Sequence, residues 1–460
     1  MKCRSLRLAP LARSLLAAGL SCALMSGALA DDEATRIQAL EGRLDSSLRL
    51  IEALSARLAD LERAKPEAKA AHVAGQSVAP TSAQAQTQAQ AQDITALQDS
   101  VAQLSDSLSK RSSDTGLPVH GFADVGAGWS SGADPQRLRG FNGGTLDLYL
   151  TPQFGQRVKS LVELAIEYGT DGGVAIDMER LQLGYTVSDD ITVWMGRFHT
   201  PFGLWNTAFH HGANLQTSVF RPRFVDFEDK GGIIPAHSVG LWASGKTSAP
   251  GGKLSYDAYL ANGPSIQNRT LDFNAFTDNS ANKMLGLNLG YRPGGALSGL
   301  TLGLHGFAST VAALDNNKRQ LSLTKLGMTG AYVGYDADDW EAIGEFYHFS
   351  SSDVATGAAH ASNAGFVQLG KTFDAVTPFV RYERVSLAAA DNYFLSQESG
   401  RSYKRLAMGL RYALDPRSSL KIELSNTSES AVTQIDESGA AAPFAGGSYR
   451  RAALQYSVAF

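Results

Sequence analysis

Apolar and polar residues alternate along most of the chain, from residue 117 to the end. The segment 159–169 (KSLVELAIEYG) has apolar side chains at every second position, and segments 284–292 and 452–460 repeat the pattern. A period of two residues is typical of β-strands with one apolar and one polar face. The pattern predicts about sixteen strands, which start near Val119, Thr145, Lys159, Glu179, Ile191, Ser238, Leu254, Lys283, Leu300, Thr324, Trp340, Ala364, Thr377, Tyr403, Leu420 and Tyr449.

The connections between these segments alternate in length. Short turn sequences occupy 155–157, 188–190, 248–252, 293–295, 336–339, 374–375 and 415–418. Long connections lie between them, at 130–144, 204–237, 263–282, 311–323, 351–363, 388–402 and 430–448. A soluble β-sandwich has no reason to separate loop lengths in this way, whereas a membrane barrel has tight turns at one end and long loops at the other. The sequence therefore predicts an all-β chain that forms a single antiparallel transmembrane β-barrel over residues 117–460.

Aromatic residues support the membrane interpretation. Several outward positions near the predicted strand ends carry tyrosine: Tyr168, Tyr185, Tyr291, Tyr382, Tyr412 and Tyr456. Aromatic rings form girdles at both interfaces of a membrane barrel. The alternative is the ordinary preference of strands for aromatic residues, but that preference would not favour the strand ends.

A different period, of 3.5 residues, precedes the predicted barrel. It runs through residues 31–63, is interrupted by an Ala/Gln/Pro-rich linker at 64–92, and returns at 93–111. Such a seam predicts an α-helical coiled coil in two segments. The alternative is one amphipathic helix that lies on its own domain, but the low-complexity linker makes such folding back difficult. Self-association is the favoured interpretation.

Composition and the first residues restrict the cellular location. Residues 1–30 have a basic start, an apolar stretch and an Ala-Leu-Ala cleavage site, which predicts a secretory signal peptide. The chain has 41 Lys+Arg and 45 Asp+Glu, a net charge of -4 that becomes -8 when the four signal cations are removed. This balance does not fit a nucleic-acid partner. Both cysteines, Cys3 and Cys22, lie in the signal, so the mature chain has no disulfide or thiolate metal site.

Two local sequences resemble a known class of proteins. The segment 194–203 (WMGRFHTPFG) is similar to a strand-to-loop segment of the phosphate-selective porin O/P superfamily, and the closing segment 456–460 (YSVAF) resembles the end of Gram-negative outer-membrane porins. The resemblance implies a trimeric barrel of sixteen strands. It covers about residues 117–460, and the N-terminal coiled coil departs from the simplest porins. Phosphate specificity is not carried over.

The long connection 204–236 is the candidate pore constriction. In porins the third external loop typically folds into the lumen, and this connection is the longest in the chain. It carries the candidate constriction residues His210, His211, Arg221, Arg223, Asp226, Glu228 and Lys230. Opposed charges in a narrow aqueous pore select solutes by charge and dipole. The alternative is a solvated external loop whose charges only keep it soluble.

Charged residues at inward strand positions are candidates for the pore wall: Arg381, Glu383, Arg405, Arg411 and Lys421. Further inward positions hold a cation at Arg451 and carboxylates at Asp147, Glu163, Glu167, Glu341, Glu345 and Glu423. A phosphate channel would show an excess of cations along its path. Because the predicted wall is mixed, it disfavours strict phosphate specificity.

These patterns together predict an outer-membrane porin that passes small hydrophilic solutes, with anionic solutes as one option. The expected partners are outer-membrane lipid, the solutes, two further copies in a homotrimer, and a periplasmic or peptidoglycan contact through the coiled coil. An enzyme is not predicted, because the sequence has no G-x-S-x-G or comparable signature. We expect no cofactor and no metal, since adjacent histidines on a strand point apart. The alternative functions are a barrel that sheathes another protein or tethers the envelope and, with less support, a hydrolase embedded in the barrel.

Overall fold

The computed structural model describes residues 119–460, except 133, 135–136, 155, 169–172, 210–212, 229 and 273–282. The chain divides into two units, Met1–Gly116 and Leu117–Phe460, and only the second contains described residues. The predicted signal peptide, coiled-coil segments and linker therefore lie outside the described residues, as do His210 and His211.

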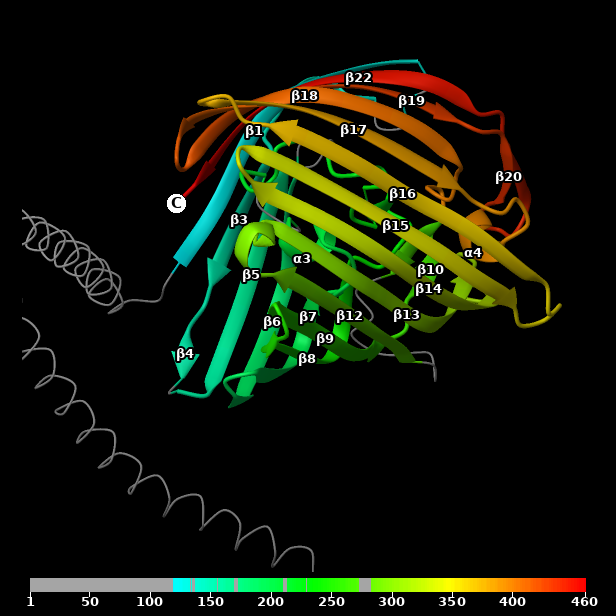
Figure 1. Cartoon of the computed structure of the whole chain (residues 1–460). Helices are drawn as coiled ribbons and strands as arrows, with labels where there is room; N and C mark the ends of the chain where they lie inside the picture. The colour runs from blue at the N-terminus through cyan, green and yellow to red at the C-terminus, as the bar shows by residue number, and fades with distance from the viewer. Residues whose placement is uncertain are drawn as a thin grey trace, which may run out of the picture. The chain divides into compact units, whose positions relative to one another are not determined.

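The described chain is a closed antiparallel β-barrel of 16 strands (Figure 1). Its long strands are β1 (Val119–Gly132), β3 (Thr145–Leu150), β5 (Val158–Tyr168), β6 (Val174–Ser188), β7 (Ile191–His199), β8 (His237–Ala249), β9 (Gly252–Asn262), β12 (Lys283–Pro293), β13 (Leu300–Leu314), β14 (Gln320–Ala337), β15 (Trp340–Asp353), β16 (Ala359–Lys371), β17 (Val376–Ser386), β18 (Tyr403–Asp415), β19 (Ser418–Glu429) and β22 (Gly447–Ala459). Each predicted strand start lies in one of them, so the predicted fold class is confirmed for the barrel.

Shorter elements complete the wall and its loops. The strands β2 (Arg139–Asn142) and β4 (Gln153–Phe154) flank β3, and β10 (Ser265–Gln267) and β11 (Thr270–Asp272) form a hairpin after β9. A further hairpin, β20 (Val432–Ile435) with β21 (Ala441–Phe444), lies between β19 and β22. The helices are α3 (Trp205–Ala208), η1 (Arg223–Val225), η2 (Gly295–Leu297) and α4 (Asn392–Leu395). Within the described residues no helix is long and apolar enough to cross a membrane.

The first and last strands close the barrel. Antiparallel pairing of β1 with β22 runs from Phe122 opposite Ala459 to Gly132 opposite Tyr449. Closure pairs the backbone groups that an open sheet would leave at its edges. The C-terminal Phe460 adds to the closure, because its carbonyl accepts a hydrogen bond from the Gly121 amide at 3.0 Å.

Side chains alternate between the two faces of the wall, with polar side chains inside and apolar side chains outside, the reverse of a soluble protein. Along β19, Lys421 and Glu423 are fully buried, whereas the intervening Ile422 and Leu424 are 44% and 51% exposed. The polar face therefore lines the interior and the apolar face covers the outside. This is the pattern of a barrel whose outer surface contacts lipid.

The short connections are tight hairpins at one end of the barrel. Between β14 and β15, Asp338 and Asp339 adopt positive φ angles of 53° and 64°. Two central residues with positive φ form the turn type that matches strand twist, and Asp tolerates this conformation better than most residues. Because the strands are antiparallel, the long connections all lie at the opposite end, which we call the long-loop end.

Candidate functional site: the lumen and its inner loop

The connection between β7 and β8, residues 200–236, is named here the inner loop. It starts from a closed base, because His199 at the end of β7 pairs directly with His237 at the start of β8. The Thr200 amide donates to the Ala236 carbonyl at 2.8 Å. The buried Asn206 side chain donates to the same carbonyl at 3.2 Å, and also to that of Thr200 at 2.9 Å. Hydrogen bonds therefore hold the two ends of the inner loop together where it leaves the barrel wall.

Backbone amides of the inner loop are bonded to carboxylates on distant strands. The Leu204 amide donates to Glu345 on β15 at 3.1 Å. The amides of Val219 and Phe220 both donate to Glu423 on β19, at 2.9 and 3.0 Å. Neither β15 nor β19 pairs with β7 or β8. The loop must therefore cross the lumen and attach to the far wall.

Arg381 on β17 is the strongest single attachment between wall and loop. Its guanidinium donates to the Ser218 hydroxyl at 3.0 Å, to the Phe220 carbonyl at 3.0 Å and to the Arg221 carbonyl at 3.3 Å. It also pairs with Glu383 at 3.0 Å, and both side chains are fully buried. A guanidinium has five donors in a rigid fork, so it can satisfy several loop acceptors at once.

An aromatic cluster holds the inner loop inside the barrel. Trp205 contacts Phe366 of β16 edge-on, with ring centroids 5.6 Å apart. Phe224 meets Tyr347 of β15 in the same manner at 5.2 Å. All four side chains are at least 97% buried. Edge-to-face pairs add about 0.5–1.5 kcal/mol each beyond the burial of apolar area, so this cluster stabilises a fixed loop position.

The two predicted constriction arginines have different surroundings. Arg221 donates to the Asn206 side chain at 3.1 Å and to the Val225 carbonyl at 2.8 Å, so it binds groups of the loop itself. Arg223 instead pairs with Glu429 of β19. Its own amide donates to Glu383 at 2.9 Å. Arg221 therefore supports the loop from within, whereas Arg223 attaches the loop to the barrel wall.

Asp226 faces Arg221 across a gap of 3.8 Å between carboxylate and guanidinium. Burial raises the pKa of Asp226 above its usual range, and the charge of Arg221 partly opposes this shift. Burial also lowers the pKa of Arg221, with Asp226 acting in the opposite sense. Each charge therefore helps to keep its partner ionised inside the barrel.

The other two predicted loop residues have separate roles. Glu228 accepts hydrogen bonds from the backbone amides of Ala236 and His237, the latter at 3.2 Å, and so closes the base of the loop. Lys230 reaches the wall at β5, where its ammonium group donates to Glu167 at 2.5 Å. Among the candidate loop residues that the structure describes, Lys230 is the one whose side chain is well exposed, at 38%.

The predicted wall residues are gathered around the same loop. Arg405 donates to Glu423 at 3.2 Å, and Lys421 donates to a loop carbonyl at 3.4 Å. Arg411 reaches the loop residue Asn214 at 3.5 Å. The mixed charge of the wall therefore has a structural role. Its carboxylates accept hydrogen bonds from loop amides, and its cations donate hydrogen bonds to loop carbonyls.

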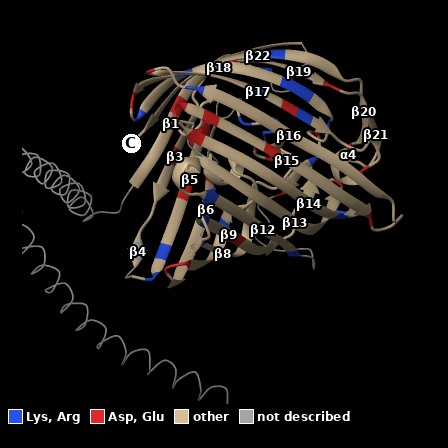
Figure 2. Ribbon diagram, viewed as in Figure 1, with Lys and Arg blue, Asp and Glu red and all other residues tan. Residues whose placement is uncertain are grey.

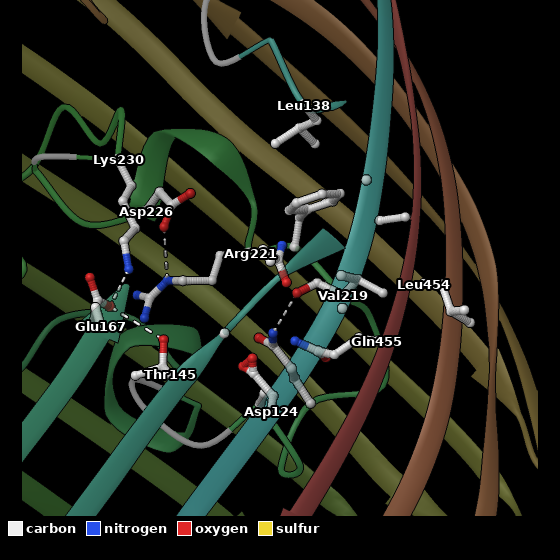
Figure 3. Close-up of a pocket in the computed structure, with 18 of the residues that line it drawn as sticks. Asp124, Leu138, Thr145, Glu167, Val219, Arg221, Asp226, Lys230, Leu454 and Gln455 are labelled. Atoms are coloured by element: carbon white, nitrogen blue, oxygen red, sulfur yellow. Dashed lines mark hydrogen bonds and ion pairs between the residues drawn. The ribbon is translucent and has the colours of Figure 1, made fainter. Parts of the chain in front are cut away.

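Three cavities lie in the lumen beside the inner loop. A long-loop cavity of about 230 Å³ includes residues of the β17–β18 connection, and a middle cavity of about 540 Å³ lies against β1, β3 and β5 (Figure 3). Phe220, Asp226 and Lys230 line both of these. A short-turn cavity of about 400 Å³ shares Phe209 and Gln216 with the middle cavity. The shared residues show that the middle cavity adjoins each of the other two.

Charge differs along this series. Cations prevail in the long-loop cavity, which is lined by Arg223, Lys230, Arg401, Arg405 and Arg451 against Asp226, Glu228 and Glu398. Carboxylates prevail in the middle cavity, which is lined by Asp124, Asp147, Glu167 and Asp226 against Arg221 and Lys230. Figure 3 shows Lys230 and Arg221 beside Glu167 and Asp226 at the wall of the middle cavity.

Some residues at the site were not identified from the sequence. Phe220 lines the junction of two cavities, and the loop-wall hydrogen bonds use Ser218 and Asn214. Alternation along a strand predicts which wall residues face inward, but no comparable period exists in the loop. The pattern therefore gives no signal for these three positions.

The barrel is similar to solved porin structures. An anion-selective porin from Comamonas acidovorans matches with a TM-score of 0.52 and 14% sequence identity, over 75% of this chain and 99% of that chain. The described part of the chain has a porin fold. A loop-deletion mutant of OmpT from Vibrio cholerae matches with a TM-score of 0.48 and 10% identity, over 75% and 99% of the two chains. The channel DcaP of Acinetobacter baumannii matches with a TM-score of 0.46 and 11% sequence identity, over 75% of this chain and 97% of that chain. No protein-family profile and no curated protein sequence matches this chain.

Proposed function

We propose that this protein is an outer-membrane porin that passes small hydrophilic solutes by passive diffusion. The observation that carries the proposal is a row of three adjoining lumen cavities that have residues of the inner loop in common. A polar lumen inside an apolar exterior is the arrangement of a water-filled channel through lipid. The similar fold of an anion-selective porin agrees with this function.

The inner loop forms the constriction in this proposal. Its position is fixed by attachments on β15, β17 and β19, so the path for solutes is confined to the side of β1, β3 and β5. The narrow point lies where Phe220, Asp226 and Lys230 separate the long-loop and middle cavities. His210 and His211 remain predicted members of the constriction.

Anionic solutes are the proposed preferred substrates. A solute that enters from the long-loop end first meets the cavity in which cations prevail. It then passes Lys230, whose partly exposed side chain lies at the junction with the middle cavity and pairs with Glu167. Cations concentrate anions at such an entrance, although the carboxylates beyond it oppose strong selectivity.

Assembly and location complete the proposal. The barrel forms a homotrimer in the outer membrane, with the coiled coil in the periplasm as a contact to peptidoglycan or another envelope component. The long loops face the outside of the cell. Deletion of residues 31–110 should leave a folded barrel, because the described pairing that closes β1 onto β22 begins at Phe122.

Conductance across planar bilayers tests the function directly. The purified mature chain should insert as discrete ion-conducting steps, and the reversal potential in a salt gradient should show a modest preference for anions. A barrel that inserts and folds but never conducts would contradict the porin assignment and favour a plugged sheath.

A further inference from the structure

An apolar groove of about 510 Å³ lies on the outer face of the barrel, across β18, β19, β22 and β1. It is lined by Trp129, Leu406, Met408, Leu424 and Ala452. The first four of these are 44–52% exposed, and the intervening Arg405 and Glu423 point into the lumen. The groove is therefore on the lipid-facing side of the wall, and of its lining only Arg451 also borders a lumen cavity, the long-loop cavity.

Three cations stand at the end of this groove that is nearer the long loops. Arg450 lines the groove itself. Lys404 is the next outward residue after Leu406 along β18, and Arg384 of β17 lies directly opposite Lys404. All three are exposed, and none forms an ion pair within the described part of the chain. Figure 2 shows basic segments on these neighbouring strands in the upper part of the barrel.

The pairing of Arg384 with Lys404 calls for an anion. Like charges that lie directly opposite on neighbouring strands repel and destabilise the pair. Exposed lipid-facing cations are also costly unless they are near the interface or neutralised. The groove lining contains no carboxylate. Of its two arginines, Arg451 is buried and paired with Asp134, so the exposed Arg450 is the one for which the lining supplies no countercharge.

We propose that this surface binds an anionic lipid of the outer leaflet through a phosphate-bearing headgroup. The headgroup phosphates lie against Arg384, Lys404 and Arg450, and an acyl chain occupies the apolar groove below them. Charge complementarity favours this occupant over a second copy of the chain, because the rim offers cations and the rest of the lining is apolar or uncharged. Trp129 lies at the same level, as expected for an aromatic side chain near a membrane interface. The inference relies on the proposed membrane position but not on solute preference.

Lipid retention by the purified full chain tests this proposal. The detergent-solubilised protein is incubated with bisphosphorylated lipid A, with dephosphorylated lipid A or with phosphatidylcholine, and bound lipid per barrel is measured by native mass spectrometry. The wild type should retain the bisphosphorylated lipid preferentially. In R384Q/K404Q/R450Q its affinity should fall by roughly 100-fold, since three juxtamembrane cations are lost.

Two further variants make the result specific. K253Q/R292Q removes a like-charged pair that is also directly opposite, but on the inward face of β9 and β12 at the short-turn end, where Arg292 lines the short-turn cavity. It should retain lipid like the wild type. A452W fills the groove without removing a cation and should weaken binding of the same lipid at least about tenfold.

The outcomes are separable from the pore proposal. Equal retention by the triple variant and the wild type would overturn the lipid site, and so would an equal loss in K253Q/R292Q. Crosslinks that join the groove to a second barrel in place of bound lipid would also overturn it. Planar-bilayer conductance is measured on the same samples, so a non-conducting wild type would contradict the porin function while the lipid result stands.

Discussion

Arg381 and Glu383 lie two residues apart on β17, 3.0 Å from each other, and each bonds the inner loop. Arg381 donates to loop carbonyls, whereas Glu383 accepts the amide of Arg223. One ion pair thus satisfies both donors and acceptors of a segment that is about 160 positions away in sequence.

Removal of the Arg381 guanidinium should therefore free the loop. In R381M the loop carbonyls lose their donor and Glu383 is left buried with fewer partners, which costs about 3–5 kcal/mol. We expect higher and noisier single-channel conductance from a barrel that still folds, as judged by heat-modifiable migration in gels. The control is R384Q on the same strand, where the side chain faces outward; an identical conductance change there would contradict the anchor.

Gly203 gives a second way to disturb the loop. It has a φ of +61°, and a Cβ at this position would meet Glu345 and the Tyr347 hydroxyl. G203A should displace the Glu345 carboxylate that binds the Leu204 amide. The thermal unfolding temperature should fall, and the loop should be held less firmly.

The matched control for Gly203 is Gly357, which has a φ of +75° and open space around the Cβ position. G357A carries the backbone strain without the clash, so it should cost only about 1 kcal/mol and leave conductance unchanged. Equal effects of the two substitutions on conductance would show that the contact with Glu345 has no role.

Sequence alternation predicts more of the wall than of the loop. The period of two places Arg381, Glu383 and Lys421 on the inward face, and all three are buried. The loop partners of these wall residues could not be predicted from the sequence. Loop residues such as Ser218 have no periodic pattern, and they come close to Arg381 and Lys421 only when the whole barrel has closed around the loop. Their roles in solute passage remain predictions.

Charge selectivity should depend on Lys230 and Arg223 and less directly on Arg221. K230Q and R223Q each remove a cation that lines the long-loop cavity, so the anion-to-cation permeability ratio should fall by a factor of about 2–10. R221Q should mainly loosen the loop, because this side chain binds Asn206 and Val225.

Reversal potentials across a salt gradient measure these changes. The differences should fade near 1 M salt, where charge effects extend only about 3 Å. Wild-type selectivity in K230Q/R223Q would place the filter elsewhere, among wall residues such as Arg405 and Arg411.

Orientation can be tested with small epitope tags. Tags at Ser131, Gly357 and Gly439 lie at the long-loop end and should be accessible on intact cells. Tags at Gly251 and Gly294 lie in hairpins between β8 and β9 and between β12 and β13, so they should need permeabilised cells. Equal labelling of both sets would contradict the proposed orientation.

Selectivity should also change with pH through Asp226. Burial raises the pKa of this carboxyl above its usual range, so it becomes protonated at a higher pH than exposed carboxylates do. As pH falls through that raised pKa, one negative charge leaves the junction of the long-loop and middle cavities while Lys230 and Arg223 keep theirs. Anion preference should therefore rise as the pH falls through the raised pKa of Asp226. In D226N the reversal potential should already show the higher anion preference at neutral pH, and the contribution of Asp226 to the pH curve should be lost. A D226N pore that follows the wild-type pH curve would assign the step to another group.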